Sequence, residues 1–231
     1  MKIIRYLDHQ GKAAYAAQQA DGSALKLSAD LFHSPKPTGE PARVLKLAPE
    51  NSRFVNRKED LTGELAKNFL GFEIHYPAEM KRSESATNFL DIATRSADGI
   101  PLEQMIITRY KSRGAMGLDR PNFPKLAGAS NADLKERIGT SFRVVGNGET
   151  AIQNGRWRGY EVKFEGLLPD GKTRLFGRRI WIPVQSPGVQ NGFVITLLAT
   201  SLADGITGAE DVGTKGKLAV AIENFEPEQN Y

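Results

Sequence analysis

The chain contains no cysteine, and histidine is almost as scarce. Its 231 residues include only three histidines, His9, His33 and His75. Disulfide bonds, thiolate metal ligands and cysteine nucleophiles are therefore excluded together. A metal or acid–base site needs several such side chains converging on one point. We accordingly expect neither a metal nor any other cofactor, and the balance of the sequence is against an enzyme.

Long apolar runs are also missing. No stretch approaches the roughly 18 uninterrupted apolar residues of a membrane-spanning helix. The opening stretch, MKIIRYLDHQGK, lacks the apolar run of about seven or more residues that a secretory signal needs. We expect a cytoplasmic protein without a membrane span, or an exported protein if a signal has been removed.

The sequence supports neither a phosphate-binding loop nor the nucleophile elbow of a serine hydrolase. The stretch VGNGET lacks the Gly-Lys-Ser/Thr of a phosphate-binding loop, and no helix signal follows it. Its Asn147-Gly148 pair is typical of a turn that leads into a strand. No serine stands in a Gly-x-Ser-x-Gly elbow, although a dispersed Ser-His-Asp triad stays open because its members need not be adjacent.

The remaining composition is that of an ordinary soluble protein. Charged residues make up 25% of the chain and hydrophobic residues 40%, with a net charge of +4 that permits acidic partners without requiring them. Residues 1–50 contain short alternating runs, the turn pair Asp21-Gly22 and the proline-rich connector HSPKPTGEP. We interpret them as a small β-rich segment, and the polar residues 51–69 as a linker that carries a turn of helix.

From Leu70 onward the patterns predict an α+β domain over residues 70–231. Strands are expected in LGFEIHYP, TNFLDIAT and LEQMIITRYKS, and a helix in SNADLKERIGTSF with its N-cap at Ser130-Asn131. Three long strands follow, RWRGYEVKFEGLL, KTRLFGRRIWIPV and GFVITLLATSL, and then a closing helix that carries Val212, Leu218, Ile222 and Phe225. This order favours an antiparallel β-sheet flanked by helices.

Residues 1–50 resemble the N-terminal domain of the fumarylacetoacetate hydrolase family. The resemblance lies in the opening strand, the Asp21-Gly22 turn, the step Ala29-Asp30-Leu31-Phe32 and the closing Leu-Ala-Pro. It implies a metal-dependent catalytic domain with Glu-x-Glu, a later aspartate and His-x-x-Glu. Here the only comparable stretch, HYPAE, has the spacing His-x-x-x-Glu, and ENSRFVNRK replaces the family's Gly-Leu-Asn-Tyr. Only the N-terminal fold is therefore carried over.

Residues from about 70 to 227 resemble the PsbP-like superfamily, which includes the DcrB-type bacterial proteins. The stretches that carry the resemblance are GFEIHYPAEM, GRWRGYEVKFEG, NGFVITLLATS and KLAVAIENF. The resemblance implies a central antiparallel sheet flanked by helices, and an accessory or binding protein rather than an enzyme. Two separate resemblances in one chain also fit a fusion of two parts.

Two constellations are candidates for a site. Glu73 and His75 share one face of a predicted strand, but the more economical interpretation is a solvated face with Phe72 and Ile74 turned inward. If the next long strands pair through the Asp170-Gly171 turn, Arg158 and Arg178 come close to opposite one another. A basic and aromatic surface would then comprise Arg156, Trp157, Arg158, Arg178, Arg179 and Trp181.

That face allows three interpretations: a plain solvated sheet face, a protein-binding surface, or a track for single-stranded nucleic acid. Glu161, Glu165 and Asp170 dilute the basic track. We expect a non-catalytic interaction protein whose partner is another protein, with nucleic acid as the lesser possibility and no prediction of oligomeric state. The alternative is a divalent-metal-dependent hydrolase of acylpyruvate-like substrates, based on residues 1–50 alone.

Overall fold

The computed structural model describes most of the chain. The described residues are 2–7, 13–19, 23–27, 37–41, 46–47, 51–153, 155–184 and 190–228. The chain divides into two compact units, residues 1–50 and residues 51–231.

The first unit contains a five-stranded antiparallel sheet in the order β4-β3-β2-β1-β5. Its strands are β1 (Lys2–Leu7), β2 (Ala13–Gln18), β3 (Ala24–Leu27), β4 (Pro37–Pro41) and β5 (Lys46–Leu47). β4 uses part of the proline-rich stretch that was expected to be only a connector. It lies at the edge of the sheet, where proline's missing N–H breaks no ladder. The Asp21-Gly22 turn, the Ala29–Phe32 step, His9 and His33 lie outside the described residues.

The main sheet of the second unit has seven antiparallel strands in the order β11-β12-β13-β14-β10-β9-β8. These strands are β8 (Lys81–Arg82), β9 (Leu90–Arg95), β10 (Pro101–Lys111), β11 (Arg143–Ile152), β12 (Trp157–Leu167), β13 (Arg174–Pro183) and β14 (Asn191–Thr200). A smaller antiparallel sheet has the order β15-β7-β6 and contains β6 (Asn51–Asn56), β7 (Phe72–Pro77) and β15 (Phe225–Pro227).

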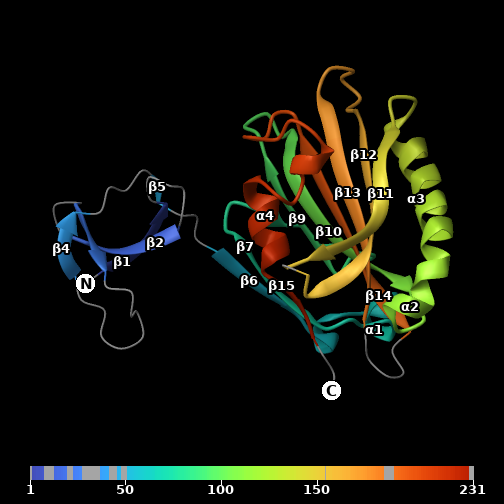
Figure 1. Ribbon diagram of the computed structural model, residues 1–231, viewed down its shortest axis with the longest axis horizontal. Coiled ribbons are helices and arrows are strands. Elements are labelled where there is room, and N and C mark those ends of the chain that lie inside the picture. The colour runs from blue at the N-terminus through green and yellow to red at the C-terminus, as the bar shows by residue number, and fades with distance from the viewer. Residues whose placement is uncertain are drawn as a thin grey trace. The chain divides into compact units, whose positions relative to one another are not determined.

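Helices lie on both faces of the main sheet (Figure 1). The α-helices are α1 (Gly63–Lys67), α2 (Met116–Asp119), α3 (Phe123–Ile138) and α4 (Gly216–Glu223), and the 3-10 helices are η1 (Lys58–Asp60), η2 (Arg120–Asn122) and η3 (Ala209–Asp211). On one face α3 packs Phe123 against Trp181. On the other face α4 and the small sheet pack against Ile180 and its neighbours. The α+β class, with antiparallel sheets flanked by helices, is therefore confirmed.

Side-chain alternation places most of the core as expected. Met105 and Ile107 of β10 are fully buried, whereas Ile106 between them is only half-buried. The same rule buries Phe72 and Ile74 of β7 and leaves Glu73 and His75 partly exposed, which confirms the interpretation of that strand. Among the described residues, no helix combines the length and the apolar character needed to cross a membrane.

Several predicted boundaries are wrong. Residues 51–69 are not a linker, because β6 pairs with β7 along its whole length and η1 and α1 follow it. α3 begins at Phe123, with Pro124 in its first turn, rather than at Ser130-Asn131. Asn147-Gly148 lies inside β11 and not in a turn. The closing helix is shorter than its apolar spacing suggested, and Phe225 belongs to β15.

Candidate functional site

The predicted basic and aromatic surface is divided between the two faces of the main sheet. β12 and β13 pair with Lys163 opposite Arg178 and Tyr160 opposite Trp181, whereas Arg158 lies opposite Ala151 of β11. The expectation that Arg158 and Arg178 face each other is therefore wrong. Because the turn between β12 and β13 spans more residues than the Asp170-Gly171 pair, the register differs from the one assumed.

Arg178 and Trp181 are interior residues. Arg178 is 9% exposed, its Nε donates a hydrogen bond to the carboxylate of Glu161, and its Nη2 donates to Thr150 Oγ1 at 3.1 Å. Trp181 is 3% exposed and packs under α3 in the cluster that contains Phe123. Neither side chain can contribute to an exposed sheet face, so the six predicted residues do not form one surface.

Arg179 takes an intermediate position beneath α3. Its Nε donates to Thr196 Oγ1 at 3.0 Å and its Nη1 donates to Ser130 Oγ at 2.6 Å. The guanidinium thereby connects β13 and β14 to α3. Arg158 is exposed on the same strand face, nearer the start of β12.

Arg156 and Trp157 are held at the turn between β11 and β12, next to β15. The Arg156 guanidinium lies 5.4 Å from the centroid of the Trp157 ring, and its Nη1 is 3.5 Å from Glu226 Oε1. Trp157 Nε1 donates to Gln153 Oε1 at 2.8 Å, and Gln153 Nε2 donates to the carbonyl oxygens of Glu223 and Phe225. These hydrogen bonds hold Trp157 and Gln153 beside the small sheet, and the exposed Arg156 side chain lies against the Trp157 ring.

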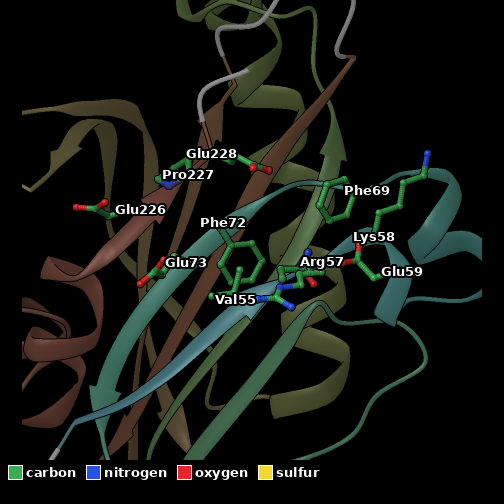
Figure 2. Close-up of a pocket in the computed structure, with 11 residues that line it drawn as sticks. Val55, Arg57, Lys58, Glu59, Phe69, Phe72, Glu73, Glu226, Pro227 and Glu228 are labelled. Carbon is green, nitrogen blue, oxygen red and sulfur yellow. The ribbon is translucent and has the colours of Figure 1, made fainter. Parts of the chain in front are cut away.

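A groove of about 500 Å³ runs along the small sheet, on the side that carries Glu226 (Figure 2). We call it the small-sheet groove. The buried ring of Phe72 lies at its centre, with the half-buried Phe69 beside it. One rim carries the carboxylates of Glu73, Glu226 and Glu228, and the opposite rim carries Val55, Arg57, Lys58 and Glu59.

The acidic rim follows from strand alternation in β15. Phe225 and Pro227 are buried, so Glu226 and Glu228 both project outward. The backbone N–H of Glu228 donates to the carbonyl oxygen of Gly71 at 2.8 Å, which continues the pairing beyond the strand end. Two carboxylates two residues apart therefore face the same side of the groove.

Asn56 gives the groove an unused hydrogen-bond acceptor. The side chain is 3% exposed, and its Nδ2 donates to the carbonyl oxygen of Leu70 at 2.7 Å. Its Oδ1 is buried and has no hydrogen-bond partner among the described residues. Buried amide oxygens are normally satisfied, so this atom favours a ligand or water that brings a donor. Asn56 also lines a neighbouring pocket of about 520 Å³.

Glu73 is the most strongly stabilised charge of the groove. Its Oε1 accepts from Arg53 Nε at 2.6 Å and lies 2.8 Å from His75 Nε2, and its Oε2 accepts from Arg53 Nη2 at 2.8 Å. The hydrogen bonds from Arg53 and then from His75 lower the pKa of Glu73 to about 2. Glu73 and His75 thus satisfy each other's hydrogen-bonding groups. In the described part of the chain, no three His, Asp or Glu side chains converge as metal ligands.

The groove was missed at the level of sequence. Its members come from three segments, 55–59, 69–73 and 226–228, and they meet only because β15 pairs with β7 and β7 with β6. The one local signal was the alternation in FEPE, where apolar and acidic residues take turns. The site can bind charged and apolar groups side by side. Glu73, the carboxylate next to the His75 imidazole, is already paired with Arg53.

Comparisons with known proteins find one matching family model and similar solved structures. A family model described as Rv2993c-like, N-terminal, matches residues 1–48. That description names no activity, so the fumarylacetoacetate hydrolase resemblance of this segment stays a prediction. No curated protein matches the chain.

Two solved structures are similar over most of the length. One is LpqN, involved in cell envelope biogenesis of Mycobacterium tuberculosis, at 13% identity and a TM-score of 0.44, covering 77% of this chain and 91% of LpqN. The other is cyanobacterial PsbP (CyanoP) from Synechocystis sp. PCC 6803, at 11% identity and a TM-score of 0.46, covering 78% of this chain and 94% of that one. We draw no functional argument from likeness at this level.

Proposed function

We propose that this protein is a non-catalytic interaction protein that binds another protein through the small-sheet groove. The observation that carries the proposal is the groove itself: an open hollow in which the half-buried Phe69 lies between two charged rims. Protein interfaces likewise surround apolar and aromatic contacts with a polar rim.

The rims define the chemistry of the partner. Glu226 and Glu228 are exposed, and the only ion pair that either makes among the described residues is the long contact of Glu226 with Arg156. A lysine or arginine of the partner would pair with these carboxylates, and an apolar side chain would cover Phe69. We therefore infer an extended segment that carries basic and apolar residues, with its charge pairs governing orientation and encounter.

Arg156 and Trp157 extend the proposed surface beyond the groove. They are the part of the sequence-predicted surface that adjoins it, since Arg156 contacts Glu226 and Trp157 is held through Gln153. Arg178 and Trp181 have no place in this proposal because they are buried. The hydrolase alternative rests on the resemblance of residues 1–50 and stays a prediction.

A charge-reversal experiment tests the proposal. Wild type and the double variant Glu226→Lys/Glu228→Lys are immobilised, and proteins captured from nuclease-treated lysate are identified by mass spectrometry. The matched control, Glu79→Lys/Glu136→Lys, reverses two exposed carboxylates outside the groove. We expect a protein retained by wild type and control but lost by the groove variant. With the purified partner, the groove variant should bind at least about tenfold more weakly, which corresponds to one or two lost charge pairs.

Two results would overturn the proposal. One is a partner that binds the groove variant as tightly as wild type in the purified system. The other is a protein that wild type captures from untreated lysate but no longer captures after nuclease treatment, which would favour nucleic acid. Circular dichroism and thermal unfolding of all three proteins establish that the reversals leave the fold intact.

A further inference from the structure

A second cleft, of about 460 Å³, lies on the opposite side of the main sheet from α4. It is bounded by α3, by β10, β13 and β14, and by the loop that precedes β9. α3 lies along one side of the main sheet in Figure 1. We call this space the α3 cleft. It shares none of its lining residues with the small-sheet groove.

Arg179 is the central polar group of the α3 cleft. The side chain is half-buried, and both of its hydrogen bonds go to neutral hydroxyls, those of Thr196 and Ser130. It forms no ion pair with a carboxylate in the described part of the chain. Its Nη2 makes no hydrogen bond to any described residue. A guanidinium is a five-donor group, so donors remain available toward the cleft.

The other charged groups around Arg179 belong to α3. Asp133 and Arg137 are one helical turn apart, and Arg137 Nε donates to Asp133 Oδ1 at 3.0 Å. The single carboxylate is thus already paired, and the positive charge of Arg179 is left without a partner. Arg109 also contributes to the lining, but strand alternation places it with Ile107 and Phe193 on the other face of the sheet, and its charge acts on Glu64.

Burial makes this unpaired charge costly. Desolvation lowers the pKa of Arg179, Asp133 acts in the opposite direction, and Arg137 adds a further lowering through like-charge repulsion. A buried guanidinium is ordinarily matched by a carboxylate or phosphate that accepts two of its N–H groups.

The remaining lining is rich in hydroxyls, with Thr87, Thr108, Ser130 and Thr196 all at the cleft.

We propose that the α3 cleft binds an oxyanion, the carboxylate or phosphate group of a small ligand, through the free face of the Arg179 guanidinium. Arg137 contributes positive charge at the rim, Asp133 weakens binding, and the threonine hydroxyls donate to the remaining oxygens. The indole of Trp181 forms one wall of the cleft. This site is independent of the protein-binding groove.

Titration with simple oxyanions tests the site. Inorganic phosphate and, separately, acetate are titrated into the full chain at constant ionic strength, with binding followed by calorimetry, tryptophan fluorescence and thermal unfolding. At least one anion should bind and raise the unfolding midpoint, since a ligand that binds only the folded state stabilises it. Binding by phosphate alone indicates a phosphorylated ligand, and binding by acetate alone indicates a carboxylate ligand.

Four variants separate a specific site from general attraction to a basic protein. Arg179→Gln should weaken binding by about tenfold or more, the usual effect of losing charge-assisted hydrogen bonds. Arg137→Gln, on the exposed face of α3, should weaken it about threefold, whereas Asp133→Asn should tighten it by about the same factor, because each changes a nearby charge. Arg158→Gln, the matched control on an exposed arginine of β12, should leave the dissociation constant within about twofold.

The proposal fails if neither anion binds wild type more tightly than chloride does. It also fails if Arg158→Gln weakens binding as much as Arg137→Gln, or if Asp133→Asn does not tighten it. The last two comparisons remain decisive even if Arg179→Gln does not fold, because both α3 positions are exposed or half-buried.

Discussion

Glu73 offers a measurable test of charge in the small-sheet groove. Its two bonds from Arg53 and one from His75 hold the pKa at about 2, against an ordinary value of 4.5. Because the folded pKa is depressed, the stabilisation from this carboxylate is present above pH 4.5 and is lost as the pH falls through 2. We expect the side-chain carboxyl resonance of Glu73 to titrate far below that of a free glutamate in an NMR pH series.

The variant Arg53→Gln provides the control for this titration. Removing the guanidinium should move the Glu73 titration upward, toward its ordinary value, while His75 still donates. A Glu73 resonance that titrates near 4.5 in the folded wild type would contradict the ion pair seen in the structure.

At the residue scale, the sequence predicted which face of a strand a side chain takes, but not which elements cover that face. Alternation correctly assigned Phe72 and Ile74 to the interior, because one side of β7 faces the core and the other faces solvent. For β13 the prediction grouped Arg178 and Trp181 on one exposed surface, and it was wrong: the two side chains point to opposite faces, and both are buried. Helices cover both sides of that strand, and the covering helices are remote in sequence.

Glu103 links two distant elements, β10 and α4. Its Oε1 accepts from the backbone N–H groups of Lys217 and Leu218 at 2.9 and 3.1 Å, at the start of a helix whose N-cap, Lys215, makes no side-chain cap. A Cβ at Gly216, where φ is 68°, would lie 2.4 Å from that oxygen, so glycine leaves room for it. The free N–H groups of a helix start are thereby satisfied from outside the helix.

We expect Glu103→Ala to lower the free energy of unfolding by about 2 kcal/mol, because one buried and one partly buried N–H group lose their acceptor. Glu103→Gln should cost less, since its amide oxygen can still accept and burial already raises the pKa of Glu103 by disfavouring its charge. Urea unfolding of both variants and of Glu79→Ala, an exposed control, measures the difference. Equal loss in Glu103→Ala and Glu79→Ala would contradict the cap.

Elements with strong periodicity were predicted well, and short or edge elements were not. β10 and β12 largely alternate between buried and partly exposed residues, and β14 is an almost continuous apolar run, so each of these strands is recognisable from its own sequence. β6 was taken for a linker because its sequence, NSRFVN, is mostly polar. The structure agrees with that polarity, since Asn56 is the only buried residue of the strand. Its strand character comes from pairing with β7, and pairing over a separation of about 20 residues has no local signature.

At the scale of the whole molecule, the change of character near residue 50 was visible in composition, and the division of the chain falls at residues 50 and 51. The small-sheet groove could not be predicted at this scale, since it joins the start and the end of the second unit through β6 and β15. Each segment alone is an ordinary polar stretch. Only the antiparallel pairing of β15 and β6 with β7 brings the two rims together.

The second unit should fold without residues 1–50. Its two apolar clusters draw their described members from residues 54–222 and from Phe225, so a chain of residues 51–231 keeps every one of them. We expect its thermal midpoint to stay within about 3 °C of that of the matching transition in the full chain, which corresponds to a change of no more than about 1 kcal/mol for a domain of this size. Calorimetry of both chains measures it, and phosphate titration of the short chain should give the same dissociation constant as the full one. A short chain that unfolds without a cooperative transition would show that the core of the second unit depends on residues 1–50.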